Sequence, residues 1–187
     1  MGFRQHSEYS GLHAFLSPSK YSWVRYDEEK LLATFDNYLA TAKGTEDHDF
    51  ASRCIKRRQK LKGGKHDTLV MFVNDAIGFK MDSEVVLKPY EITNCFGTAD
   101  AISYRDGVLR IHDLKTGKSA THMEQLEIYA ALFCLEYGVR PSDIDIILRI
   151  YQSGEINEYL PPSDEIDAII EKIIVFDELI ERRKQEV

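Results

Sequence analysis

The chain has 187 residues, 43% of them hydrophobic, and a formal net charge of -7 at pH 7. This length and composition suffice for one domain with a buried core, so we expect a single domain over residues 1–187. No run of 18 apolar residues occurs, and the N-terminal MGFRQHSEYSG lacks the apolar run of a signal peptide. The sequence therefore argues against a membrane-spanning or secreted protein and predicts a cytoplasmic one.

Residues 1–80 are predicted to be mainly helical. Asp27 can cap a helix that continues to about residue 42, and Gly44 is expected to end it. Two further helices are predicted over residues 45–61 and 68–79.

A cluster of basic residues lies in the helix predicted over residues 45–61 and just beyond it. Residues 53–65, RCIKRRQKLKGGK, hold seven basic residues and no acid, while the other 17 basic residues of the chain stand against 31 acids. Such a cluster is either a solvated helix face or a surface for a polyanion such as DNA. Its members are Arg53, Lys56, Arg57, Arg58, Lys60, Lys62 and Lys65.

Residues 81–155 are expected to form the sheet, beginning with a strand over 83–88. The dipeptide Asp106-Gly107 predicts a hairpin over 97–115 with a two-residue turn. The resulting register pairs Arg105 with Val108, Tyr104 with Leu109, and Ile102 with Ile111.

The same register places Asp100 opposite Asp113, at the end of an apolar face. Like charges directly opposite destabilise a sheet, so we expect a bound cation or a shared proton there, unless the two side chains splay apart. Lys115, two residues after Asp113, points to the same side. His112 should point to the other face, and we leave it out of the site.

The remainder of the chain predicts an α/β fold. Thr121 and Glu124 read as the capping box of a buried helix, residues 144–151 as a strand, and residues 156–187 as a segment with an amphipathic helix. The TGKS stretch at 116–119 is not a phosphate-binding loop, because such a loop needs glycine at position 112.

Taken together, these motifs resemble the PD-(D/E)XK nuclease superfamily, in its RecB-like branch of phage recombination exonucleases and CRISPR-associated adaptation nucleases. The similarity covers roughly residues 15–155 and consists of five elements in the family's order. They are LSPSKYSW near the N-terminus, Gly44 and His48 in KGTEDHDFA, Asp100 in GTADAI, Asp113 and Lys115 in DLK, and Gln125 and Tyr129 in a Q-x-x-x-Y helix.

The resemblance implies a restriction-endonuclease-like core, in which a central mixed sheet with a metal-binding hairpin is flanked by helices. It implies a metal-dependent deoxyribonuclease, with an exonuclease that processes DNA ends in phage-type recombination or repair as the leading hypothesis. A structure-specific or restriction-like endonuclease and a non-catalytic DNA-binding accessory subunit stay open. DNA is the expected partner, and a single-strand annealing protein and a homo-oligomer are further candidates, in the host cytoplasm if the protein is phage-encoded.

The resemblance also assigns roles to individual residues. Asp100 and Asp113 become metal ligands, with His48 as a third and the backbone carbonyl of Leu114 completing the set. Oxygen ligands with one imidazole favour Mg²⁺ or Mn²⁺. Lys115 would orient the attacking water or stabilise charge on the phosphate. An iron-sulfur cluster is not expected, because it needs four thiolates and the chain has three cysteines.

Each of these residues also has a more ordinary explanation. His48 could be a surface or core histidine, and Lys115 could form a plain salt bridge. For Gln125 and Tyr129, packing in a buried helix is as good an explanation as positioning water, DNA or the lysine. Glu84 could be an auxiliary acid, but the sequence favours a carboxylate at a strand edge.

Overall fold

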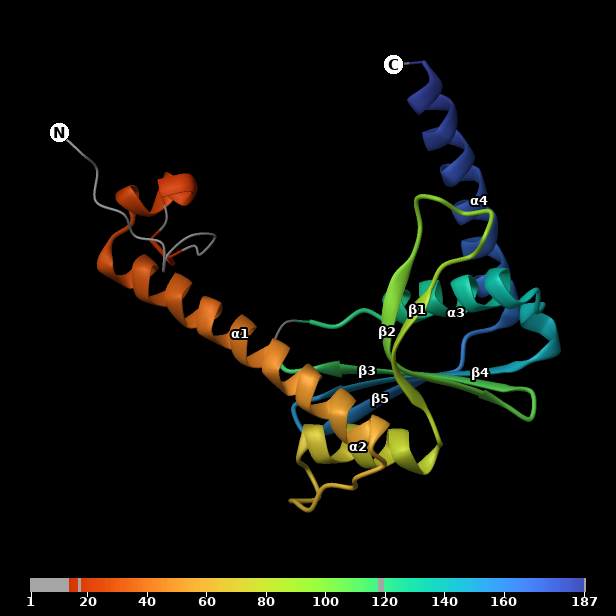
Figure 1. The fold of residues 1–187 in the computed structure, drawn as a ribbon, viewed down its shortest axis with the longest axis horizontal. Coiled ribbons are helices and arrows are strands. Elements are labelled where there is room, and N and C mark those ends of the chain that lie inside the picture. The colour runs from red at the N-terminus through yellow and green to blue at the C-terminus, as the bar shows by residue number, and fades with distance from the viewer. Residues whose placement is uncertain (1–13, 17, 118–119, 187) are drawn as a thin grey trace, which may run out of the picture. The chain divides into compact units, whose positions relative to one another are not determined.

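The computed structural model describes residues 14–16, 18–117 and 120–186, so MGFRQHSEYSG, Ser17 of the LSPSKYSW segment and part of TGKS lie outside the described residues. The chain divides into two compact units, Met1–Lys43 and Gly44–Val187. The second unit is an α/β structure in which helices flank a five-stranded mixed sheet (Figure 1). The predicted α/β class is therefore confirmed.

The first unit contains the 3-10 helix η2 (Pro18–Arg25) and the first part of helix α1 (Glu28–Lys56). Asp27 caps α1 as predicted, since its Oδ1 accepts a hydrogen bond from the Lys30 amide at 2.8 Å. The rings of Phe15, Phe35 and Tyr38 form a small aromatic cluster, in which Phe15 lies 5.0 Å from Phe35 and 5.4 Å from Tyr38 between centroids.

The sheet has the strand order β1-β2-β3-β4-β5, with one parallel pair, β3 and β4. Its strands are β1 (Asp82–Leu87), β2 (Gly97–Arg105), β3 (Val108–Lys115), β4 (Asp145–Gln152) and β5 (Glu155–Tyr159). The short edge strand β5 was not predicted. Its turn consists of Ser153 and Gly154, which both have positive φ angles, as a tight hairpin turn requires.

The predicted hairpin register is confirmed between β2 and β3. Arg105 pairs with Val108, Tyr104 with Leu109, and Ile102 with Ile111. At the turn, Asp106 and Gly107 have φ angles of 52° and 77°, so both central residues adopt the conformation that a type I′ turn needs.

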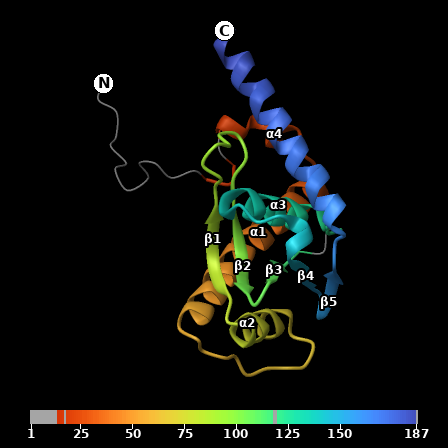
Figure 2. The same cartoon turned by 90° about the vertical axis from the view of Figure 1, so that its right-hand side faces the viewer.

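Helices cover both faces of the sheet (Figures 1 and 2). On one face, α3 (Glu124–Tyr137) packs Leu126 and Ala130 against Leu109 and Ile111, and α4 (Ser163–Gln185) lies beyond α3. On the other, α2 (Thr68–Gly78) and the end of α1 pack against further strand residues. This second core contains Ile55, Phe72, Ala101, Leu114 and Tyr151, among others. No described helix is both long and apolar enough to cross a membrane.

The prediction that Gly44 ends the first helix is wrong, because α1 continues without interruption from Glu28 to Lys56. Gly44 is buried, and a Cβ atom at this position would lie only 2.7 Å from Oγ1 of Thr116. The glycine therefore allows α1 to approach the end of β3 closely, and it does not end the helix.

Two other predicted helix boundaries are also wrong. Helix α1 stops at Lys56, short of residue 61, because Arg58 adopts a φ of 54° and the Gln59 amide donates to the Cys54 carbonyl, a Schellman-type end formed without glycine. Helix α3 begins at Glu124 with Met123 as its N-cap residue and no side-chain cap, so the predicted capping box at Thr121 does not form.

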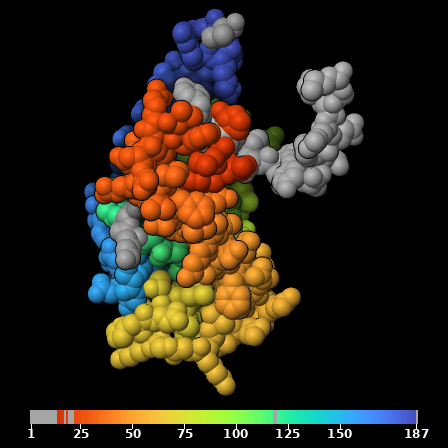
Figure 3. Space-filling view, turned by 90° about the vertical axis from the view of Figure 1, so that its left-hand side faces the viewer, coloured from red at the N-terminus to blue at the C-terminus, as the bar shows by residue number. Residues whose placement is uncertain are grey.

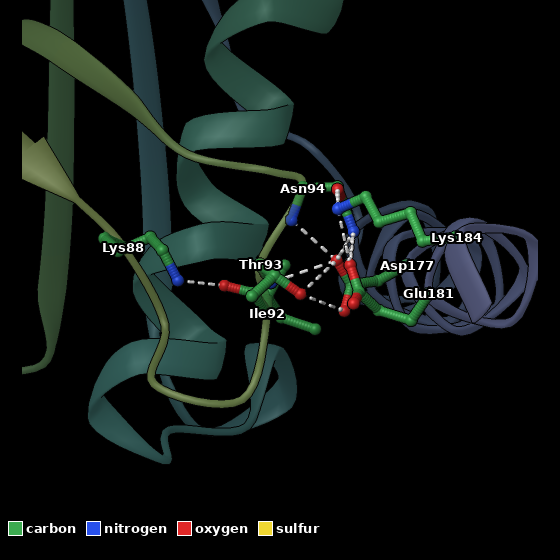
Figure 4. Close-up of polar contacts among 7 residues, drawn as sticks. All are labelled: Lys88, Ile92, Thr93, Asn94, Asp177, Glu181 and Lys184. Carbon is green, nitrogen blue, oxygen red and sulfur yellow. Dashed lines mark hydrogen bonds and ion pairs between the residues drawn. The ribbon is translucent and has the colours of Figure 1, made fainter. Parts of the chain in front are cut away.

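A polar network attaches the loop between β1 and β2 to α4 (Figure 4). Asp177 is buried and accepts hydrogen bonds from the backbone amides of Thr93 and Asn94 at 3.0 and 2.7 Å. Lys184 Nζ donates to Asn94 Oδ1, and Lys88 Nζ donates to the Ile92 carbonyl within the loop. Although burial by itself would raise the pKa of Asp177, the hydrogen bonds from Asn94 and Thr93 lower it overall.

Candidate functional site

Asp100 lies where the ladder between β2 and β3 ends. The last pair is Ala101 with His112, so the predicted opposition of Asp100 and Asp113 falls one step beyond the paired residues. Instead, Asp100 Oδ2 accepts a hydrogen bond from the Leu114 amide at 2.9 Å. The carboxylate thus takes the place of a main-chain acceptor, which fixes its position relative to β3. The Leu114 carbonyl as a metal ligand stays a prediction.

His48 reaches this carboxylate from α1. Its Nδ1 lies 3.4 Å from Asp100 Oδ2, and its side chain is about one third exposed, at 32%. The hydrogen bond with Asp100 is the main reason that the pKa of His48 is raised, against the opposing effect of burial, and the negative charges of Asp113 and Glu84 add to it. The close contact of Gly44 with Thr116, one helical turn earlier, brings this part of α1 to the end of β3.

Glu84 completes a group that sequence analysis did not assemble. One side-chain ligand atom from each of His48, Glu84 and Asp100 lies within 4.8 Å of the others. Ser83 pairs with Ala101 and Val85 with Ala99, so Glu84 lies across from Asp100 on neighbouring strands. To place Glu84 in this group from the sequence, one would need the register between β1 and β2. The sequence does not give this register, because the loop that joins the two strands has no recognisable turn type. Burial, followed by the charge of Asp100, raises the pKa of Glu84.

The backbone at Glu84 is strained. Its φ of 55° is in the left-handed region, which a residue other than glycine adopts at a cost on the order of 1 to 3 kcal/mol. Strand β1 also changes face here: Ser83 bonds to Ser52 of α1, whereas Val85 packs against the core under α3. The neighbours of Glu84 thus contact opposite sides of the sheet, and their packing holds the backbone at Glu84 in this conformation.

Asp113 is the buried acid of the site, with only 4% of its surface exposed. Its Oδ1 accepts a hydrogen bond from Lys115 Nζ at 3.1 Å. Its Oδ2 lies 2.9 Å from the same ammonium but has no hydrogen-bond partner among the described residues. Burial, then the charge of Asp100, raises the pKa of Asp113, and Lys115 opposes this shift. Asp113 is therefore paired primarily with Lys115 and lies outside the His48–Glu84–Asp100 group.

Helix α3 contributes Gln125, whose Oε1 accepts a hydrogen bond from Lys115 Nζ at 2.9 Å. Tyr129, one turn later, lies over the start of β2, where a Cβ atom on Gly97 would be 2.9 Å from the Tyr129 ring. The structure thus brings Gln125 to the lysine and places Tyr129 in a packing contact. Whether either residue takes part in a reaction stays a prediction.

All seven members of the basic segment are exposed, and the stretch that follows α1 forms part of the surface seen in Figure 3, in orange to yellow. Arg58 is tied to the fold, since its guanidinium donates to the Met81 carbonyl at 2.6 Å and lies 3.3 Å from Asp82. Lys56 lies close enough to the site to lower the pKa of Glu84 by its charge. The segment therefore begins beside the carboxylates and continues away from them.

His112 lies away from the site, as predicted from strand alternation. It is fully buried on the α2 side of the sheet, where its Nδ1 lies 3.2 Å from the hydroxyl of Tyr151. Burial is the main cause that lowers the pKa of His112 to about 3, with Arg149 and Arg110 contributing.

No protein-family model and no curated protein matches the chain. A structure search finds similarity to a solved chain titled "Crystal structure of SSO0001", with 13% sequence identity over 68% of this chain and 85% of that chain. The TM-score of 0.31 is too low for this similarity to support an argument about fold or function.

Proposed function

We propose that the chain is a divalent-metal-dependent DNA nuclease with a restriction-endonuclease-like core, acting as an exonuclease on DNA ends. One observation carries the proposal: the His48–Glu84–Asp100 group stands beside the Asp113–Lys115 pair at one end of the central hairpin. Carboxylates, an imidazole and an ammonium in this arrangement supply what phosphodiester hydrolysis requires, namely a cation site and a donor for the phosphate oxygens.

The residues present fit a divalent cation. Two carboxylates and one imidazole are ligands that Mg²⁺ or Mn²⁺ accept, and the imidazole favours Mn²⁺. His48, Glu84 and Asp100 would hold the ion, with Asp113 as the adjacent ligand expected from the sequence. Such an ion would activate water and neutralise charge on the phosphate.

Lys115 is positioned to act on the phosphate. An ammonium group has three protons, and contacts with Asp113 and Gln125 direct two of them. The third can reach a phosphate oxygen or the attacking water. Hydrolysis joins the oxygen of this water to phosphorus and breaks one phosphorus–oxygen ester bond, and the departing oxygen gains a proton. Lys115 would stabilise the negative charge that develops on the phosphate during this step.

The basic segment supports DNA as the substrate. Its exposed side chains begin beside Glu84 and suit the regularly spaced phosphates of a nucleic-acid backbone. Contacts of this kind are independent of base sequence and weaken as salt concentration rises, as expected for an enzyme that degrades DNA without regard to sequence.

Digestion of end-labelled single- and double-stranded linear DNA, with Mn²⁺, Mg²⁺ or a chelator, tests the proposal. We expect metal-dependent release of nucleotides, reduced by roughly a hundredfold or more in Lys115→Ala and Asp113→Ala. Lys172→Ala, a change of an exposed lysine on α4, is the matched control and should retain activity.

Three results would separate the alternatives. Cleavage of closed circular DNA would indicate an endonuclease. DNA binding without cleavage under any metal condition would indicate a non-catalytic accessory subunit. Full activity of Lys115→Ala would show that the proposed site does not perform the reaction.

A further inference from the structure

One face of α1 meets three strands of the sheet in turn. Gly44, His48 and Ser52 are spaced four residues apart, so they follow one another along one side of the helix. Gly44 makes its close approach to the end of β3, His48 contacts Asp100 on β2, and Ser52 contacts Ser83 on β1. His48 therefore has a further contact between α1 and the sheet one helical turn to either side of it.

The contact between Ser52 and Ser83 is buried and uses both hydroxyl groups. Each serine is only 6% exposed, and the two Oγ atoms lie 3.0 Å apart. Ser83 Oγ also donates a hydrogen bond to the Ser52 carbonyl at 3.3 Å. Because a hydroxyl has one proton, this bond leaves the proton of Ser52 to bond Ser83 Oγ. A buried hydroxyl that loses its partner destabilises the fold, so the pair fixes β1 against α1.

This contact lies beside two of the proposed metal ligands. Ser83 directly precedes Glu84, at a step of about 3.3 Å along a strand. Ser52 follows His48 by one helical turn, a rise of about 6 Å along α1. The hydrogen bonds between the serines therefore join the two backbone segments that carry these ligands, close to where the ligand side chains leave the backbone.

Glu84 depends on such an anchor more than an ordinary strand residue does. Its φ of 55° is in the left-handed region, and a return to the usual strand conformation would point its side chain in another direction. Ser83 anchors the backbone before Glu84 to α1, and Val85 anchors the backbone after it to the core under α3. Loss of the serine hydrogen bonds would remove one of these two anchors.

We propose that Ser83, through its hydrogen bonds with Ser52, is a positioning residue for the His48–Glu84–Asp100 group. The inference rests on the proposed function, because it concerns the metal site of that function. Neither serine would touch the ion or the DNA. The pair would set the spacing between an imidazole on α1 and a carboxylate on β1. A small divalent cation such as Mg²⁺ is sensitive to this spacing, because it holds its ligands at about 2.1 Å in a nearly fixed geometry.

Isothermal titration with Mn²⁺ alone tests the inference without reference to catalysis. We expect Ser83→Ala, which loses both hydrogen bonds, to weaken Mn²⁺ binding about tenfold or more, as changes to residues that orient metal ligands do. Ser52→Ala keeps the bond from Ser83 to the carbonyl of residue 52, so its loss of affinity should be measurable but smaller.

Ser103→Ala is the matched control. This serine of β2 is also buried, at 8% exposure, but its Oγ has no hydrogen-bond partner within the described part of the chain. The variant should bind Mn²⁺ as the wild type does. Circular dichroism and urea unfolding identify the variants that fold, and Ser52→Ala takes the place of Ser83→Ala if the latter does not.

A second comparison separates positioning from a general effect on the fold. If Ser83 acts by placing Glu84, the two residues must be coupled. In a Glu84→Gln background, in which this ligand is already impaired, Ser83→Ala should therefore weaken Mn²⁺ binding much less than it does in the wild type.

The outcomes distinguish this inference from the proposed function. Wild-type protein that binds no Mn²⁺ would overturn the metal site and the inference with it. If the wild type binds Mn²⁺ but the folded serine variant binds it equally well, the serine pair only stabilises the fold and the inference alone is wrong. An undiminished effect of Ser83→Ala in the Glu84→Gln background would also refute it.

Discussion

Lys115 Nζ donates a hydrogen bond to Gln125 Oε1 at 2.9 Å, which connects the last residue of β3 to the first turn of α3. Gln125 is thereby a second acceptor for the ammonium, beside Asp113. We expect Gln125→Ala to lower the turnover of DNA roughly ten- to a hundredfold, because the loss of one hydrogen bond to a charged group is worth about 1.5 to 3 kcal/mol. Lys115 keeps its contact with Asp113 in this variant. Steady-state cleavage assays measure the effect.

Tyr129→Phe is the matched control for this prediction. It lies on the same helix, and its ring packs over Gly97, a contact that phenylalanine preserves. If Tyr129→Phe lowers turnover as much as Gln125→Ala does, the tyrosine hydroxyl also takes part in the site.

Glu84 is expected to contribute to metal binding. Glu84→Gln removes one negative charge from the His48–Glu84–Asp100 group and should weaken the binding of Mn²⁺ by a factor on the order of 10 to 100. Isothermal titration with Mn²⁺ alone measures this without reference to catalysis. Glu91→Gln, in the exposed loop after β1, should bind Mn²⁺ as the wild type does, and equal affinity in both variants would remove Glu84 from the metal site.

Gly44 is predicted to be coupled to Thr116. Replacing a glycine inside a helix by alanine normally stabilises a protein by up to about 1 kcal/mol. Here, the added Cβ would come within 2.7 Å of Thr116 Oγ1, so Gly44→Ala should give less than that gain or a loss. In a Thr116→Ala background, the normal gain should return. Urea unfolding of both single variants and the double variant measures the coupling, and simple additivity would contradict it.

Two neighbouring arginines are expected to differ in their effect on DNA binding. Arg57 is exposed, and Arg57→Ala should weaken DNA binding uniformly across sequences and reduce the salt slope by about 1 if it contacts one phosphate. Arg58 is already engaged with Met81 and Asp82, so Arg58→Ala should mainly lower the free energy of unfolding. Anisotropy titrations at several salt concentrations, with urea unfolding, distinguish the two effects.

His112 should make the fold sensitive to moderate acid. An unfolded histidine takes up a proton near pH 6.5, but in the folded protein burial lowers the pKa of His112 to about 3. Between these values the unfolded chain binds more protons, so the free energy of unfolding should fall as the pH drops below 6.5. Unfolding by urea from pH 7.5 to pH 5 measures this loss, which should be smaller in His112→Phe. An equal loss in both proteins would assign the acid sensitivity to other groups.

The sequence predicts the hairpin well because its register depends on local chemistry. Asp106 and Gly107 favour one turn type, and the turn then determines every pair up to Ala101 and His112. The contact between Lys115 and Gln125 likewise joins two elements that are close in the sequence. Helix α2 depends on its own sequence pattern, and its bounds lie within one residue of the predicted ones.

The sequence could not predict features that depend on distant segments. Gly44 reads as a helix stop, and only the approach of Thr116 shows why a glycine lies inside α1. The place of Glu84 in the site depends on the register of β1 on β2 across an irregular loop, which no turn motif specifies. Arg58, just beyond the end of α1, has a positive φ where glycine is preferred. Its hydrogen bonds to Met81 and Asp82 join segments that are far apart in the sequence.

The single parallel pair in the sheet has a consequence for the order of folding. Strands β1, β2 and β3 form antiparallel pairs through short connections, whereas β3 and β4 can pair only after the chain has passed through α3. Closing that longer loop costs more chain entropy, so we expect the meander of β1 to β3 to form before β4 joins it. The strands that carry Glu84, Asp100 and Asp113 would then be in register early, while Lys115 acquires its contact with Gln125 only when α3 docks.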